Sequence, residues 1–256
     1  MDFVTRTLLR IGLAINFHRL TPFLKILASY IRYNIAIEKN KNFSESRDII
    51  LICGLPKSGT TWLENLLSVK GDFKNLMPVD ITRWEQKYGR SDDYEPHKDI
   101  FARIPKGKWL IKVHSKYSDN LMNLIRRHNL KLIVLYRDID EVLDSHLHYV
   151  SKTKFHPDYN HIKRLSKIDG FHFLRHKYAE DYAMWIKDWL SKDVFTIDYN
   201  DLLSNTESIL ANTYEFLEIE VDSKGIDEII KYNSLDNMKK RSVQKDFFRG
   251  KNVIPK

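Results

Sequence analysis

Three short patterns place basic side chains where they could bind an anion and help to transfer a group from it. Lys57 lies in a loop of small residues that follows the apolar run Ile49–Cys53. Lys112 and His114 end a second apolar segment, and Arg137 ends a third. Lysine and arginine bind phosphate-like oxygens, and histidine is well suited to accept a proton near neutral pH. Together these residues favour the binding of an anionic group, although Lys112 and His114 taken alone are also compatible with a solvated strand end.

The first pattern, Asp48–Gly71, predicts a buried strand, a tight loop and a helix. Ile49–Cys53 is continuously apolar, as is typical of a parallel strand that is covered on both faces. Gly54, Pro56 and Gly59 interrupt the pattern and indicate the loop. The apolar residues that then recur at helical spacing are Trp62, Leu63, Leu66, Leu67 and Val69. The first amides and the dipole of such a helix favour a bound anion.

The loop departs from the Walker A pattern G-x-x-x-x-G-K-[ST] in the position of its lysine. Gly54 and Gly59 have the required spacing, and Thr61 occupies the hydroxyl position. Thr60, however, stands where the lysine belongs, and the only lysine of the loop, Lys57, lies two residues before the second glycine. A Walker lysine reaches β- and γ-phosphates, so its displacement argues against an ordinary ATPase or kinase and favours a shorter anionic group.

The second and third patterns predict strand ends that carry polar side chains. Alternation over Lys108–His114 puts Lys112 and His114 on one face of a strand, with Cα atoms about 6.5 Å apart. Lys131–Arg137 predicts a parallel strand. The carboxyl ends of such strands are where open parallel sheets bind ligands.

A helix is expected directly after Arg137. Asp138 is its predicted N-cap, and Glu141, three residues later, is the capping-box partner. Ser145 lies off the predicted buried face, eight residues after Arg137, so it can point at a ligand. The residues expected to form the buried face are Val142, Leu143, His146, Leu147 and Val150.

These patterns resemble those of the PAPS-dependent sulfotransferases, where PAPS is 3′-phosphoadenosine 5′-phosphosulfate. The string PKSGTTW at Pro56–Trp62 resembles the 5′-phosphosulfate loop of that family, and YRDIDEVLDSHLHY resembles its 3′-phosphate segment. Ile139 replaces a proline that many members have there, and Asp140 replaces a frequent basic residue. The resemblance extends over about residues 48–251. It implies a three-layer, P-loop NTPase-like α/β fold with a mostly parallel central sheet flanked by helices.

The resemblance also implies a reaction and a role for each site residue. A sulfuryl group passes from PAPS to an acceptor hydroxyl or amine, and adenosine 3′,5′-bisphosphate (PAP) is released. His114 is the expected base, Lys57 stabilises the leaving oxygen, and Lys112 holds the sulfuryl group. Arg137 and Ser145 bind the 3′-phosphate, and Ser145 also restrains Lys57. Further cofactor-binding residues implied by the family are Ser58, Gly59, Thr60, Thr61, Trp62, Tyr199, Arg249 and Gly250.

Among these residues, Trp62 is expected to pack on the adenine, and Tyr199 opens a turn like the Tyr-Glu-Asp turn of the family. Phe247–Lys251 resembles the turn that clamps the 3′-phosphate, although the Gly-Asp-Trp-Lys stretch that usually follows is absent. No metal is expected, because the lysines supply the positive charge and the sequence has no H-E-x-x-H pattern.

Composition limits the possible partners without naming one. The chain has 256 residues, a net charge of +8 and a single cysteine, Cys53, which excludes an intrachain disulfide and fits a reducing, cytoplasmic setting. The positive charge suits anionic ligands, nucleic acid or a membrane surface. With the family resemblance, the expected partner is a small-molecule, lipid or glycan acceptor, and no nucleic acid is expected.

The sequence predicts an N-terminal amphipathic segment, 1–46, before a sulfotransferase-like domain, 47–256. From Phe3 to Ile37 there are five basic residues and no acidic one, and Pro22 separates two helical stripes. Three interpretations stay open: helices packed on the core, an interfacial membrane helix that gives the protein a peripheral membrane contact through residues 3–37, and an Arg-rich transit segment. The apolar residues of the second stripe are Phe23, Ile26, Leu27, Tyr30 and Ile31.

Two rival functions remain at this stage. A divergent P-loop kinase would need an acidic magnesium ligand, for which Asp198 is the nearest candidate. A non-catalytic basic module would bind an anionic glycan, lipid or nucleic acid.

The remaining expected elements are strands at 72–77 and 193–198, helices at 119–129, 171–190, 205–217, 223–232 and 234–240, and an aperiodic stretch at 151–170.

Overall fold

A computed structural model describes residues 21–40, 46–70, 72–78, 80–81, 99–154, 156–234 and 237–238. In these residues five parallel strands form one sheet in the order β2-β3-β1-β4-β5. The strands are β1 (Arg47–Gly54), β2 (Lys74–Leu76), β3 (Gly107–Val113), β4 (Lys131–Tyr136) and β5 (Phe195–Asp198). The helices are α2 (Thr21–Asn40), α3 (Thr60–Leu67), α5 (Asp119–Arg127), α6 (Ile139–Lys152), α7 (Tyr159–Ile162), α8 (Lys167–Leu190), α9 (Tyr199–Ser204), α10 (Thr206–Phe216) and α11 (Ser223–Tyr232).

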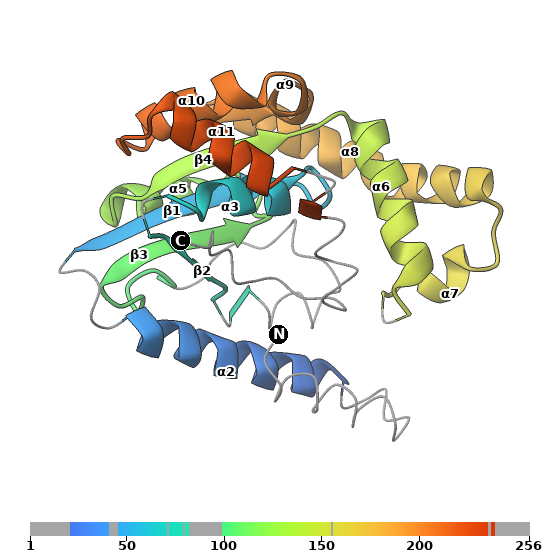
Figure 1. The fold of residues 1–256 in the computed structure, drawn as a ribbon. Helices are drawn as coiled ribbons and strands as arrows, with labels where there is room; N and C mark the ends of the chain where they lie inside the picture. The colour runs from blue at the N-terminus through green and yellow to red at the C-terminus, as the bar shows by residue number, and fades with distance from the viewer. Residues whose placement is uncertain are drawn as a thin grey trace.

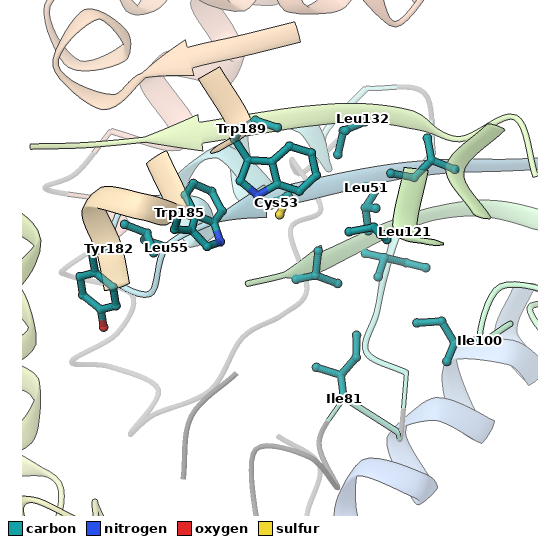
Figure 2. Packing of buried hydrophobic residues seen from close by; sticks show 14 of the residues in the cluster. Leu51, Cys53, Leu55, Ile81, Ile100, Leu121, Leu132, Tyr182, Trp185 and Trp189 are labelled. Atoms are coloured by element: carbon teal, nitrogen blue, oxygen red, sulfur yellow. The ribbon is translucent and has the colours of Figure 1, made fainter. Parts of the chain in front are cut away.

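Helices cover both faces of the sheet, so the molecule has three layers (Figure 1). Alternate residues of β1 point to opposite faces, since side chains of a strand have a period of two. Leu51 and Cys53 pack with α5, α6 and α8 in one core, part of which Figure 2 shows. Ile50 and Ile52 pack with α3, α9, α10 and α11 in the other core. Each large apolar side chain buried in this way contributes about 1.5–3 kcal/mol to stability.

All five strands run in the same direction, so the loops that follow them lie at one edge of the sheet. The loop after β1 contains Lys57, His114 follows β3, Arg137 follows β4 and Tyr199 follows β5. Four segments that are distant in the sequence are therefore brought to the same edge, which is where the sequence predicted the site.

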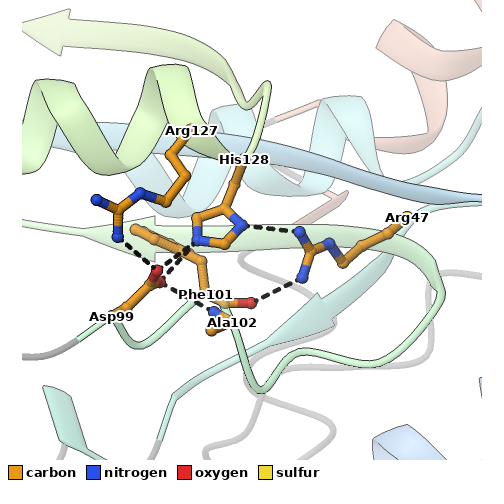
Figure 3. A network of polar contacts seen from close by, with 6 residues as sticks. All are labelled: Arg47, Asp99, Phe101, Ala102, Arg127 and His128. Atoms are coloured by element: carbon orange, nitrogen blue, oxygen red, sulfur yellow. Dashed lines mark hydrogen bonds and ion pairs between the residues drawn. The ribbon is translucent and has the colours of Figure 1, made fainter.

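The opposite edge of the sheet holds a closed network of polar contacts (Figure 3). The Arg47 guanidinium donates to the Phe101 carbonyl (3.2 Å) and to His128 Nδ1 (2.7 Å). His128 Nε2 therefore carries the proton that it shares with the Asp99 carboxylate at 2.7–2.8 Å. Burial acts to raise the pKa of Asp99, but the hydrogen bonds from His128 and the Ala102 amide outweigh it and hold that pKa below its usual value.

Most predicted elements are confirmed, with three corrections. The helix expected at 171–190 begins earlier, at Lys167, because Ser166 caps it by accepting from the Asp169 amide. The stretch 151–170 is not wholly irregular, since it contains the short helix α7. The turn expected at Tyr199 is helix α9, which Asp198 caps by accepting from the Asn200 amide. The helix expected at 234–240 is described only at residues 237–238.

The capping box predicted for α6 forms only in part. Asp138 accepts a hydrogen bond from the Glu141 amide at 3.1 Å, as predicted. The Glu141 carboxylate, however, bonds to Arg137 Nε at 2.8 Å rather than returning to the cap. The opposite charge of the arginine is the stronger attraction for this carboxylate. The predicted buried face of the helix is confirmed at all five positions.

The N-terminal helix α2 lies along the β2 edge of the sheet (Figure 1). Its buried residues include Ala28 and Ser29, and the Tyr33 hydroxyl reaches the Arg103 carbonyl at 3.5 Å. The predicted apolar stripe is only partly covered: Ile26, Leu27 and Ile31 are half-buried, whereas Phe23 and Tyr30 are 61% and 54% exposed. No helix within the described residues is long and apolar enough to cross a bilayer. The division of the chain at residue 46 stays a prediction.

Candidate active site

The loop between β1 and α3 is held in a conformation that leaves the start of the helix open toward an anion. Lys57 and Gly59 both have left-handed backbones, with φ of 73° and 94°. The buried Ser58 hydroxyl ties the loop to the Leu55 carbonyl at 2.7 Å. The amides of Thr60 and Thr61 begin α3, where no preceding turn supplies carbonyl partners. Added to the positive end of the helix dipole, these amides form a binding point for an anion.

Arg137 connects this loop to two other elements. Its Nη1 donates to the Lys57 carbonyl at 3.4 Å, and its Nε is paired with Glu141 of α6. Its guanidinium carbon lies 4.2 Å from the centre of the Tyr199 ring, which is a cation–π contact. The same ring lies so close to Gly59 that a Cβ there would overlap it, so the position requires glycine for space as well as for φ.

The side chain of Lys57 lies over the ring of Tyr149 and close to the positive charge of Arg137. Its Nζ lies 4.9 Å from the centre of the Tyr149 ring on α6. Burial lowers the pKa of Lys57, and the nearby Arg137 charge lowers it further. Both effects disfavour the charged form of this amine. An anion placed between Lys57 and Arg137 would oppose both, so the site is electrostatically suited to receive one.

Lys112 is buried and has two partners on α3. Its Nζ donates to Thr61 Oγ1 at 3.1 Å and lies 3.6 Å from a carboxylate oxygen of Glu64. Lys112 and Glu64 are 4% and 5% exposed, whereas Thr61 is exposed above them. Since the ammonium donates to the Thr61 oxygen, the hydroxyl proton of Thr61 can be directed to another acceptor at the loop. Lys112 is thus linked to the start of α3 through Thr61 and is balanced by Glu64.

His114 follows β3 and bends toward the loop. Its Nδ1 contacts the carbonyl oxygen of Gly54, the last residue of β1. A carbonyl can only accept, so Nδ1 carries a proton, and in the neutral ring Nε2 is then the nitrogen with the basic lone pair. This tautomer suits a general base. Lys112 and His114 were predicted to share one face of a strand. Only Lys112 lies within β3, because the strand ends at Val113 and His114 follows it.

Ser145 lies on α6, beside a hollow that also borders Arg137. The hollow has a volume of about 510 Å³, and Glu141 and His148 lie on its wall. Asp140, on the same wall, is paired with Arg175 of α8. Arg137 and Ser145 are therefore brought together, as their spacing predicted. The restraint of Lys57 by Ser145 stays a prediction.

Trp62 and Tyr199 pack at the side of the loop. Their ring centres are 6.2 Å apart in an edge-to-face arrangement, and Trp62 donates its indole N–H to the Asn233 carbonyl at 2.9 Å. Trp62 is only 7% exposed, so most of its ring belongs to the core and little of it can face an adenine. Its contact with the base stays a prediction.

Sequence reasoning missed three residues of this region. Glu64 had no signal beyond being the single acidic residue of α3. Glu141 could have been found as the partner of Arg137, because residues four apart on a helix-forming segment lie close together. Tyr149 lies within the predicted 3′-phosphate segment, but no role was predicted for it.

Arg249 and Gly250 lie outside the described residues. Within those residues, no group of three or more His, Cys, Asp or Glu side chains could hold a metal ion.

Comparison with known proteins identifies the family. The family model of the sulfotransferase domain matches residues 47–251. Sulfotransferase 1A1 of Rattus norvegicus is 24% identical over 227 residues, which cover 78% of this chain and 69% of that relative. The 3-beta-hydroxysteroid sulfotransferase of Cavia porcellus is 25% identical over 220 residues, with coverage of 80% and 71%.

A solved structure has the same fold. The crystal structure of mouse sulfotransferase SULT7A1 complexed with PAP aligns with a TM-score of 0.56 and 23% sequence identity, over 80% of this chain and 70% of the other. The match of the family model extends over most of the chain and includes the loop, the strand ends and the helix described above. The chain therefore belongs to the sulfotransferase family, and its reaction is PAPS-dependent sulfuryl transfer.

Proposed function

We propose that this chain transfers a sulfuryl group from PAPS to a hydroxyl group of a small molecule, with His114 as the base and Lys57 and Arg137 as the principal cations. The observation that carries this assignment is the convergence of all three residues on one loop. The Gly54 carbonyl contacts His114, and the Lys57 carbonyl accepts from Arg137. This supports a site in which His114 and Lys57 serve the transferring group at the loop and Arg137, beside the loop, holds the nucleotide.

The proposed mechanism follows from these positions. Nε2 of His114 accepts the proton of the acceptor hydroxyl while that oxygen attacks sulfur. The bond from sulfur to the bridging oxygen breaks, and its electron pair stays on the 5′-phosphate of PAP. Lys57 and the amides of Thr60 and Thr61 stabilise the charge that grows on this phosphate. As in phosphoryl transfer, positioned cations supply much of the catalysis, because charge is spread over several oxygens in the transition state.

Lys112 has a modified role in this proposal. Its ammonium is held by Glu64 and Thr61 below the loop. We propose that Lys112 polarises the Thr61 hydroxyl, so that this hydroxyl donates to the transferring sulfuryl group, in addition to any direct contact between Lys112 and that group. Arg137 and Ser145 bind the 3′-phosphate in the hollow beside α6, and Glu141 is displaced from Arg137 when that phosphate arrives.

The acceptor is proposed to be a small molecule with an alcohol or phenol group. One relative is named for a 3β-hydroxysteroid, which is a molecule of this kind. Lipid and glycan alcohols, and amines, are the alternatives. A screen with radiolabelled PAPS against phenols, sterols, lipid alcohols and short glycans would separate them, since only a true acceptor becomes labelled.

The test of the nucleotide assignment uses Arg137→Ala. PAP has a 3′-phosphate and adenosine 5′-phosphosulfate does not, so the substitution should weaken PAP far more than adenosine 5′-phosphosulfate in calorimetric titrations. Loss of a charge-assisted contact of this kind costs about 1.5–3 kcal/mol, or roughly 10- to 150-fold in affinity. Arg127→Ala is the matched control, because this arginine lies at the opposite edge of the sheet. Equal losses for both ligands would contradict the assignment.

A thermal-shift screen separates the proposal from its rivals. PAP and PAPS should stabilise the protein, because a ligand that binds only the folded state raises its melting temperature. Stabilisation by ATP with magnesium, and none by PAP, would instead favour a kinase. Binding of polyanions that disappears with salt and is unchanged in Lys57→Ala would favour a non-catalytic basic module.

We also propose a peripheral membrane contact through residues 3–37. The exposed aromatic residues Phe23 and Tyr30 on α2, together with the acid-free sequence of this segment, support it. Phe23→Ser/Tyr30→Ser should reduce sedimentation with vesicles of phosphatidylserine and phosphatidylcholine and leave PAP binding unchanged. Unchanged sedimentation would favour the interpretation of α2 as a helix packed on the core.

A further inference from the structure

One backbone carbonyl beside His114 receives an unusual number of hydrogen bonds. The carbonyl oxygen of Ser115 accepts from Trp185 Nε1 at 2.9 Å and from Trp189 Nε1 at 3.1 Å. The thiol of Cys53 donates to the same oxygen at 3.4 Å. A peptide oxygen has two lone pairs, so these donors fully engage it. The peptide unit that follows Ser115, one residue beyond His114, is therefore held from two sides, by helix α8 and by strand β1.

The donors of these bonds have little freedom of their own. Trp185 and Trp189 are 1% and 0% exposed, and Ser115 is 1% exposed. The two tryptophans are four residues apart on α8, so they project from the same face of the helix. Figure 2 shows both indole nitrogens facing the side where Cys53 lies. Indole has only one donor and no acceptor, and each of these donors points to Ser115.

The same strand also fixes the ring of His114. Gly54, next to Cys53 in β1, contacts His114 Nδ1 through its carbonyl oxygen. Two neighbouring residues of β1 thus contact two neighbouring residues after β3. The contact with Gly54 favours the tautomer of His114 with its proton on Nδ1. The next residue, Ser115, is held by the two tryptophans and Cys53.

We propose that Trp185 and Trp189 are positioning residues for the base of the sulfuryl-transfer reaction, acting through the Ser115 carbonyl. They hold the His114 backbone so that Nδ1 meets Gly54 and Nε2 faces the acceptor. The catalytic part of this inference rests on the proposed role of His114. The structural part, the control of the His114 tautomer, does not.

The experiment compares Trp185→Phe/Trp189→Phe with Trp109→Phe in the full chain. Phenylalanine keeps an aromatic ring in the core but has no N–H to donate. Trp109 is the matched control, because it is 0% exposed and donates its indole N–H to a backbone carbonyl, that of Pro105, at 3.0 Å. Each substitution therefore removes the same atoms from a buried site, two sets in the paired variant and one in the control, and only the paired variant loses the bonds to Ser115.

The first measurement is the tautomer of His114 by ¹⁵N NMR of histidine-labelled protein, assigned by the signal that is missing in His114→Ala. The wild type and Trp109→Phe should show protonated Nδ1. The paired variant should show a mixture of tautomers. This measurement needs neither nucleotide nor acceptor, so it decides the structural part of the inference even if the wild type transfers no sulfuryl group, which would itself contradict the proposed function.

The second measurement is turnover with PAPS and 2-naphthol. A small displacement of a catalytic group can cost about 100-fold in rate, so kcat of the paired variant should fall by about 10- to 100-fold. KM for PAPS and the Kd of PAP should stay within about two-fold, because the donors lie away from the nucleotide. Trp109→Phe should keep kcat even where its melting temperature falls.

The inference is overturned if the paired variant keeps the His114 tautomer of the wild type, or if its kcat falls no more than that of Trp109→Phe. Should the paired variant fail to fold, Trp189→Phe alone and Cys53→Ala each remove one donor to the same oxygen. Smaller shifts of the tautomer in both would support the inference, and an unchanged tautomer in both would overturn it.

Discussion

Arg47 and Arg137 are both arginines at an end of a central strand, but their surroundings differ in kind. Arg47, at the amino end of β1, donates to a carbonyl and to a histidine that is itself bonded to Asp99 (Figure 3). Arg137, at the carboxyl end of β4, lies next to Lys57 and lowers its pKa. Positive charge is balanced within the protein at the first end and is left partly unbalanced at the second.

The difference shows how one sheet separates stability from binding. At the amino end the polar groups find partners within the protein, so the network holds residues 99–102 against β1 and α5. At the carboxyl end the charges of Lys57 and Arg137 repel each other, which suits the proposed binding of an anionic ligand there. The carboxylates there, Glu64 and Glu141, neutralise Lys112 and part of Arg137 but not Lys57. Substitutions at the two ends should therefore affect different measurements.

The largest expected effect is at the carboxyl end, in His114→Ala. Removal of a general base lowers kcat by about 10²–10⁴-fold. The affinity for PAP should change little, since the ring serves the acceptor. Lys57→Ala should instead reduce both kcat and PAP affinity, because this amine meets the nucleotide in the ground state and the transition state. A His114→Ala enzyme with nearly full turnover would remove this residue from the mechanism.

At the amino end, Asp99→Asn should reduce stability without affecting the nucleotide. Loss of charge-assisted hydrogen bonds should lower the free energy of unfolding in urea by about 1–3 kcal/mol at pH 7. The folded-state pKa of Asp99 is lowered, so its contribution is present above the unfolded value of about 3.9 and is lost as the pH falls through the folded value.

Glu218→Gln is the control for this comparison, since Glu218 forms an exposed ion pair with Lys131, away from the hollow that borders Arg137. Such a pair contributes about 0–1 kcal/mol. If Asp99→Asn reduced the free energy of PAP binding by as much as it reduced the free energy of unfolding, the amino end of the sheet would contribute to binding as well as to stability.

A third prediction concerns the pH dependence of stability near the carboxyl end. Burial lowers the pKa of His146 to about 4, with His156, Lys57 and Lys177 acting in the same direction and Asp158 opposing them. Between that value and the unfolded value of about 6.5, the unfolded chain binds the extra proton, so stability rises with pH by at most about 1.4 kcal/mol per unit. In urea titrations from pH 4 to 7, His146→Phe should show a shallower rise than the wild type. An identical slope would show that His146 is not the titrating group.

The smallest expected effect is a gain in PAP affinity, in contrast to the loss of stability expected for Asp99→Asn. Glu141→Gln removes the carboxylate that occupies Arg137 Nε, so PAP should bind about two- to five-fold more tightly, which corresponds to less than about 1 kcal/mol. Glu218→Gln is the control, because Glu218 is exposed and pairs with Lys131 away from the loop. Weaker PAP binding in Glu141→Gln would mean that Glu141 orients Arg137 rather than competing for it.

The order of strands and helices was largely predictable because the determining signals are local. The apolar runs before Gly54 and Arg137 are the lengths of buried strands, and both are parallel strands in the centre of the sheet. Asp138 caps its helix as the sequence suggested. The sharing of one site by Lys57, His114 and Arg137 also followed, since parallel strands present their carboxyl ends at one edge. Short helices such as α7 and α9 gave no periodic signal, because they contain only one or two turns.

The sequence by itself determined which side chains reach the carboxyl edge of the sheet, and the tertiary structure decided what each of them contacts there. Period and capping depend on neighbouring residues, so they can be read along the chain. The bonds of Lys112 to Glu64, of Arg137 to Glu141 and of two tryptophans to Ser115 depend on side-chain directions in three dimensions. Buried polar groups take whichever partner packing brings within reach, because leaving them unpaired is costly. That choice is made by the folded core and not by spacing in the sequence.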